Sequence, residues 1–160
     1  MGLDINAYRG LKVAPEAELD LDGYPEDYMH FVRINPGLIA ATEAHFPSRT
    51  AGVFSGIFSF TEAIRFRAGS YSGYNIWRDW LAGISGWGTA ERCWAGKQTE
   101  GPFYELINFS DCEGVIGPIV AAKLAKDFEE FADKAGPDER YLQWRKAFTM
   151  AADGGAVMFQ

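Results

Sequence analysis

Apolar and polar residues alternate over several short stretches of the chain, which predicts β-strands. In residues 2–8, one side of an extended segment carries Leu3, Ile5 and Ala7, and the other carries Asp4, Asn6 and Tyr8. Residues 29–34 form a second candidate strand, which Asn35-Pro36-Gly37 ends. Residues 52–60 and 63–68 are rich in β-branched and aromatic side chains and predict two more strands, arranged as a hairpin.

The period of the pattern then changes from two to about 3.6 residues, which is typical of an amphipathic helix. One apolar stripe consists of Tyr74, Trp77, Trp80, Leu81 and Ile84, and the spacing turns Arg78 and Asp79 outward. A shorter helix is expected at 38–46. Residues 85–101 are glycine-rich and aperiodic and predict a loop, whereas the apolar run 103–109 suits an interior strand.

The C-terminal third has the clearest pattern. A stripe runs through residues 118–135 and consists of Ala121, Leu124, Ala125, Phe128, Phe131, Ala132 and Ala135. Gly136-Pro137 ends this helix, Asp138 can cap the next, and residues 156–160 form a short final strand. Because strands come first and helices gather late, the order predicts an α+β fold: a single domain over 1–160, with a mainly antiparallel sheet and about three helices packed on one face.

Composition narrows the classes of partner. The 160 residues are 48% hydrophobic and 15% aromatic, which is enough to form a core. With 15 basic against 22 acidic residues the net charge is −7, which disfavours nucleic acid as a partner, since such binders need a basic face. The longest uncharged apolar run, 50–61, falls short of the roughly 20 residues of a membrane span. Cys93 and Cys112 form no C-x-x-C pair, which favours a reducing, cytoplasmic setting.

The segment RFRAGSYSGYN, residues 65–75, combines several groups that bind anions. On an extended strand Arg65 and Arg67 point to one face. The chain then enters a helix near Ser72, whose first amides lack intrahelical partners. With the side chains of Ser70, Tyr71, Ser72 and Asn75 these groups would suit a phosphate or a carboxylate. Alternatively, Ser72 is only an N-cap and the arginines are solvated residues of a sheet.

Residues 108–118 form a second candidate segment. Ser110 and Glu113 fit the S-x-x-E capping box of a helix start. Asp111, Cys112 and Glu113 can instead face a pocket at the end of a strand, and the turn from Asn108 to Glu113 can share a ligand with the arginine segment. Cys112 is a candidate nucleophile, but it requires a histidine base, and the chain has only His30 and His45.

No motif indicates a metal or a cofactor. Asp20, Asp22 and Gly23 follow part of a calcium-loop pattern, but the spacing is incomplete and Pro25 interrupts it, which favours a solvated acidic hairpin. Histidines and cysteines are too scattered for a zinc site, and neither a phosphate-binding loop nor a dinucleotide fingerprint is present. Trp87 and Trp94, in the glycine-rich loop, either cover the core or contact a partner.

Four segments carry a resemblance: MGLDI at 1–5, SYSGYN at 70–75, INFSDCEGVIGP at 107–118 and AADGGAV at 151–157. Together they resemble small proteins found in phages, prophages and bacterial genomes, a family without an established activity. The likeness covers the start, the middle and much of the C-terminal half. It implies an accessory gene product of the host-cell cytoplasm that interferes with host defences, and it supplies no catalytic or binding residues.

These observations favour a non-catalytic protein that binds an anionic, phosphorylated or nucleotide-like small molecule. The expected site consists of Arg65, Arg67, Ser70, Tyr71, Ser72, Asn75, Asn108, Asp111 and Glu113. One alternative is a module that contacts a host protein through the acidic segment 16–27 or the tryptophan-bearing loop. A second alternative is a hydrolase or transferase that uses Cys112 or a carboxylate.

Overall fold

The computed structural model describes residues 1–160 and contains two antiparallel sheets. The larger sheet has four strands in the order β5-β1-β7-β6, which are Glu62–Ser70, Gly2–Arg9, Ala156–Phe159 and Gly114–Ile116. The smaller has three in the order β2-β4-β3, which are Lys12–Val13, Gly56–Ser59 and Phe31–Ile34. The predicted α+β class is confirmed, with two sheets in place of one.

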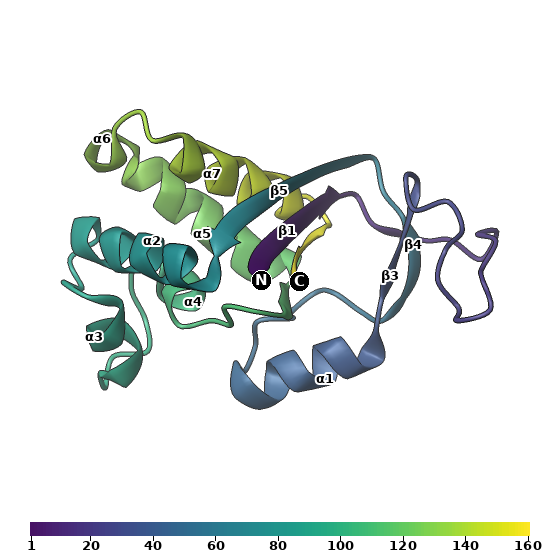
Figure 1. Ribbon diagram of the computed structural model, residues 1–160, viewed down its shortest axis with the longest axis horizontal. Helices are drawn as coiled ribbons and strands as arrows, with labels where there is room; N and C mark the ends of the chain where they lie inside the picture. The colour runs from purple at the N-terminus through teal and green to yellow at the C-terminus, as the bar shows by residue number, and fades with distance from the viewer.

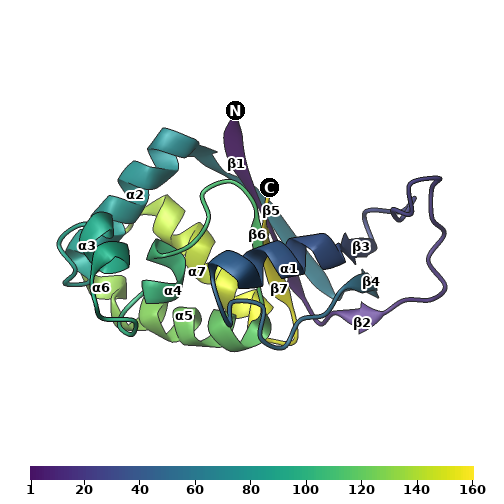
Figure 2. The same cartoon turned by 90° about the horizontal axis from the view of Figure 1, so that it is seen from below.

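The helix count is seven, so the expected three was too low. They are α1 Pro36–His45, α2 Tyr71–Ile84, α3 Ala90–Ala95, α4 Tyr104–Ile107, α5 Pro118–Glu130, α6 Ala132–Ala135 and α7 Glu139–Ala151. Figure 2 shows the larger sheet from its edge, with α2 to α7 on one side and the smaller sheet on the other. Helix α1 lies beside β6, where the Val115 amide donates to Thr42 Oγ1 at 3.2 Å.

Two hydrophobic clusters hold these layers together. Beneath the helices, Trp77, Trp144 and Phe148 stack with ring centroids 5.4 and 5.8 Å apart. A smaller cluster fills the space between the two sheets and consists of Tyr8, Val32, Ile34, Val53, Phe58, Val115, Ala156 and Met158. Strand β7 is buried along its whole length because side chains cover both of its faces, which explains its continuous apolar sequence.

Three sequence-based expectations are wrong, each for a local reason. Residues 103–109 contain helix α4, because a short, mostly apolar run reads the same for a strand as for one helical turn. The expected loop 85–101 contains helix α3, which Thr89 caps by accepting from the Arg92 amide at 3.2 Å. Strands β4 and β5 form no hairpin, since they belong to different sheets.

Residues 14–30, called the arm below, project from the smaller sheet between β2 and β3 (Figure 1). The tip is a tight turn in which Asp20 Oδ1 accepts the amide protons of Asp22 at 2.9 Å and Tyr24 at 2.8 Å. Gly23 has φ +79°, a left-handed conformation that favours glycine. The carboxylate of Asp20 is therefore engaged in folding the turn, as expected of an acidic hairpin.

Candidate functional site: two adjoining clefts

Arg65 and Arg67 lie on the same face of β5, as predicted, but their partners differ. Arg67 Nη1 is 3.6 Å from Asp4 Oδ1 in an exposed ion pair. Arg65 Nη2 donates to the Tyr28 backbone carbonyl at 3.0 Å and has no carboxylate within 4.0 Å. A carbonyl fixes the guanidinium without neutralising it. Of the predicted pair, only Arg65 keeps its positive charge free.

The N-cap of helix α2 lies two residues earlier than expected. Ser70, and not Ser72, is the N-cap, and its hydroxyl accepts from the Gly73 amide at 3.0 Å. The Ser70 and Ser72 hydroxyls lie 3.1 Å apart. One orphan amide and both hydroxyls are thus satisfied inside the protein, so they contribute little to an anion site.

The two predicted segments, 70–75 and 108–113, do lie side by side. Asn75 Nδ2 donates to Asp111 Oδ2 at 2.9 Å. The guanidinium of Arg78, only 5% exposed, joins them: it donates to Asn75 Oδ1, and its Nη2 lies 4.0 Å from Asp111 Oδ2. The expectation that Arg78 turns outward is wrong. The sequence spacing indicates its burial, because Arg78 follows Tyr74 by four residues and so lies on the same, buried face of the helix.

The capping box at Ser110 closes a turn and starts no helix. Ser110 Oγ accepts from the amides of Cys112 at 3.2 Å and Glu113 at 3.1 Å, and strand β6 begins at the next residue. Cys112 is exposed, and the one hydrogen-bond contact of its thiol is Ser110 Oγ at 3.5 Å. No histidine or carboxylate forms a hydrogen bond with this thiol, whereas the hydrolase alternative requires such a group to activate it.

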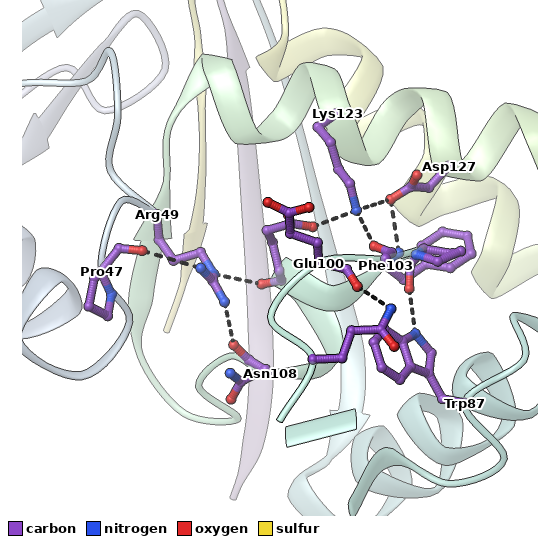
Figure 3. A network of polar contacts seen from close by, with 12 residues as sticks. Pro47, Arg49, Trp87, Glu100, Phe103, Asn108, Lys123 and Asp127 are labelled. Carbon is purple, nitrogen blue, oxygen red and sulfur yellow. Dashed lines mark hydrogen bonds and ion pairs between the residues drawn. The ribbon is translucent and has the colours of Figure 1, made fainter. Parts of the chain in front are cut away.

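Asn108 belongs to the scaffold and does not reach a cleft that carries free positive charge. Its carbonyl accepts from Arg49 Nη2 at 3.0 Å, and its side-chain amide donates to Tyr104 Oη at 2.8 Å. Figure 3 shows the same network continuing to Lys123, whose Nζ lies 2.7 Å from Asp127 Oδ2. Burial raises the pKa of Asp127, although hydrogen bonds from Lys123 and from the Phe103 amide oppose that rise.

The two loop tryptophans have different environments. Trp87 packs against the core and donates from Nε1 to the Pro102 carbonyl at 2.7 Å (Figure 3). Trp94 remains 44% exposed, and its ring lies 5.3 Å from the Arg78 guanidinium carbon. Trp87 therefore covers the core, while Trp94 presents part of its indole to solvent beside a buried cation.

A cleft of about 760 Å³ lies between the larger sheet and the arm. It is lined by Asp4, Ile5, Asn6, Tyr8, Tyr24, Pro25, Tyr28, Phe31, Val32, Arg33, Arg65, Phe66 and Gln160. Arg33, which the sequence did not single out, donates to the Asp22 carbonyl at 2.8 Å and lies 4.7 Å from the Tyr24 ring centroid. It too has no carboxylate within 4.0 Å. Burial raises the pKa of Tyr8, against the opposing charge of Arg65.

A second cleft of about 740 Å³ adjoins the first. It is lined by Tyr24, Arg33, Asn35, Gly37, Leu38, Ala41, Tyr71, Cys112, Glu113, Met158, Phe159 and Gln160. Of the residues predicted from sequence, Arg65 therefore lines the first cleft, while Tyr71 and Glu113 line the second. A third, shallower depression of about 440 Å³ contains Asn108 and Asp111 with Arg78 and Trp94.

Comparison with protein families, with curated proteins and with solved structures gives no match. No group of three or more histidine, cysteine, aspartate or glutamate side chains is placed to hold a metal ion. None of the helices has the length and hydropathy needed to cross a membrane.

Proposed function

We propose that this protein binds a phosphorylated, nucleotide-like small molecule in the first cleft, without catalysing its conversion. The observation that carries the proposal is the pair of guanidiniums, Arg33 and Arg65, that share one cleft and have no acidic partner. Both are held in place by backbone carbonyls, so they are oriented before a ligand arrives. In a protein of net charge −7 such a concentration of free positive charge selects for an anion.

The walls of the cleft favour a ligand that also carries a flat ring. Tyr8, Tyr24, Tyr28 and Phe31 present aromatic surface around the two cations. Aromatic faces stack with nucleobases, and each stacked base contributes about 1–3 kcal/mol. A charge-assisted hydrogen bond between guanidinium and phosphate contributes about 1.5–3 kcal/mol. The cleft volume, about 760 Å³, lies in the usual range for small-molecule sites, roughly 300–1,000 Å³.

The test compares three arginine variants by isothermal titration calorimetry with AMP. We expect Arg33→Gln and Arg65→Gln each to weaken AMP binding at least tenfold. A tenfold change equals about 1.4 kcal/mol, and the loss of one charge-assisted contact costs at least that much. Arg67→Gln is the matched control, because Arg67 lies two residues away on the same face but is paired with Asp4. Absence of binding by AMP and by other nucleotides, or equal losses in all three variants, contradicts the proposal.

A second candidate function is contact with a protein partner through the arm. The arm holds five of the twelve exposed large hydrophobic side chains of the whole protein: Leu19, Leu21, Tyr24, Tyr28 and Met29. Exposed apolar side chains gathered on one projection mark an interaction surface. A partner with basic residues around an apolar patch would complement the acidic groups of residues 16–27.

This second candidate predicts a partner that depends on the arm and not on the cleft. Leu21 is fully exposed, so Leu21→Ser is expected to abolish capture of the partner from a bacterial lysate without affecting folding. Capture should survive Asn6→Ala, because Asn6 lines the first cleft and its side chain bonds Gln160 and no residue of the arm. Capture should weaken as salt rises, since opposite charges at an exposed interface are screened. A captured protein that Leu21→Ser still retains would rule out the arm as its binding surface.

A further inference from the structure

The two clefts adjoin and share part of their lining. Tyr24, Arg33 and Gln160 belong to both. Arg33 thus stands at the boundary, fixed by the Asp22 carbonyl and by its position near the Tyr24 ring. A phosphate bound to Arg33 would have one cleft on each side of it, so groups attached to two of its oxygens can extend in both directions.

The second cleft differs in chemistry from the first. Its apolar wall comes from Leu38, Tyr71, Met158 and Phe159, and its polar groups are Asn35, Glu113 and Gln160. The exposed carboxylate of Glu113 forms no ion pair or hydrogen bond inside the protein. A carboxylate repels phosphate and accepts hydrogen bonds from N–H groups, such as the exocyclic amino group of a base. This cleft therefore suits a ring with an amino edge better than it suits a second phosphate.

From this arrangement we infer that the ligand is a dinucleotide, a molecule with two bases joined through phosphate. The inference rests on the proposed function and deepens it. The phosphate lies at Arg33 and one base stacks among the tyrosines of the first cleft, which Arg65 also lines. The second base occupies the second cleft with its amino group toward Glu113. The two volumes, about 760 and 740 Å³, each accommodate one nucleoside.

The experiment compares adenylyl-(3′,5′)-adenosine, which has two bases and one phosphodiester, with AMP, which has one base and more negative charge. Calorimetry is expected to show that the dinucleotide binds at least tenfold more tightly, because a second stacked base adds affinity. Glu113→Ala changes an exposed side chain and should weaken the dinucleotide severalfold while leaving AMP binding unchanged.

Cys112 supplies an independent readout, because it lines the second cleft and is exposed. The other cysteine, Cys93, is buried, and burial raises its pKa to about 11, so it does not react under the same conditions. Saturation with the dinucleotide should slow alkylation of Cys112 by iodoacetamide at least fivefold, and AMP, which occupies the first cleft alone, should not slow it.

The outcomes distinguish failure of the dinucleotide inference from failure of the proposed function. Equal affinities for AMP and the dinucleotide, with Cys112 unprotected by either, overturn the dinucleotide inference and leave the proposed function standing. Tighter dinucleotide binding in Glu113→Ala than in the wild type overturns the orientation that places the second base at Glu113, and the inference with it. Absence of binding by both nucleotides overturns the proposed function and the inference together.

Discussion

Arg78 is the buried cation that joins helix α2 to the 107–111 turn through hydrogen bonds. Replacing it with methionine removes those hydrogen bonds and keeps most of the apolar part of the side chain. In the native protein Arg78 Nη1 donates to the carbonyls of Ile107 at 3.1 Å and Phe109 at 2.6 Å. Its Nη2 donates to Asn75 Oδ1, and the guanidinium carbon lies 4.9 Å from the Tyr74 ring centroid. Arg78→Met therefore leaves two backbone carbonyls in the interior without donors.

The expected loss of stability follows from those two carbonyls. A buried acceptor that loses its donor costs about 1–3 kcal/mol, so the pair costs about 2–6 kcal/mol. The substitution also removes the free-energy cost of burying a guanidinium, which acts in the opposite direction. The two carbonyls belong to the backbone, however, so they stay in the interior without donors. Because a domain of this size is stable by only about 5–15 kcal/mol, the variant should lose a large share of its free energy of unfolding.

Urea unfolding followed by tryptophan fluorescence and by circular dichroism measures this loss. Arg140→Met is the matched control, because Arg140 is exposed on helix α7 and forms no hydrogen bond or ion pair, so it should stay within about 0.5 kcal/mol of the wild type. Arg78→Lys keeps the charge but cannot supply donors in the same geometry, and should fall between the two. Equal unfolding midpoints for Arg78→Met and Arg140→Met would refute the reasoning.

Two further predictions concern a carboxylate and a close backbone contact. Burial alone would raise the pKa of Glu43, but hydrogen bonds from the hydroxyl and amide of Thr50 and from a second amide hold it below its ordinary value of 4.5. A lowered pKa contributes stability that is lost as the pH falls through the pKa of the folded state. Glu43→Gln should therefore cost stability at neutral pH and almost none at about pH 2. A loss of stability in urea unfolding that does not depend on pH contradicts this. A Cβ on Gly155 would lie 1.8 Å from the Tyr8 carbonyl oxygen, so Gly155→Ala should cost about 3 kcal/mol or more in the same assay. Gly83→Ala, in an exposed helical position whose nearest neighbour is 3.7 Å away, should instead stabilise by about 0.5–1 kcal/mol, and a similar effect of both substitutions would be inconsistent with a steric cause.

The parts of the fold that the sequence predicts well are those with one buried face and a repeated period. Strand β1 buries Leu3, Ile5 and Ala7 as the alternation indicates, and Asp138 caps α7 by accepting from the Tyr141 amide at 2.8 Å. Helix α4 was not predicted because its four residues are too few to show a helical period.

The clefts could not be predicted from the sequence, for a different reason. Arg33 belongs to the smaller sheet and Arg65 to the larger, 32 positions apart in the chain, and only the packing of the arm beside the larger sheet brings them to one cleft. An alternating strand pattern assigns each arginine to a face of its own strand and says nothing about which faces meet. The outward-facing position of Arg65 on its strand was predictable, whereas the presence of Arg33 in the same cleft was not.

The register between β1 and β5 decides which arginine of the predicted pair is free. Asp4 lies opposite Arg67 and Asn6 lies opposite Arg65, so one guanidinium faces an acid and the other a neutral amide. Because directly opposite residues on one face are close neighbours, a slip by two residues would place Asp4 against Arg65 and pair its charge. The register shifts between Leu3 and Asp4, which sets this pairing at the end of the strand. The absence of an acidic partner at Arg65 is therefore a consequence of strand pairing as much as of composition, and for that reason a protein of net charge −7 can hold a guanidinium without an acidic partner on its larger sheet.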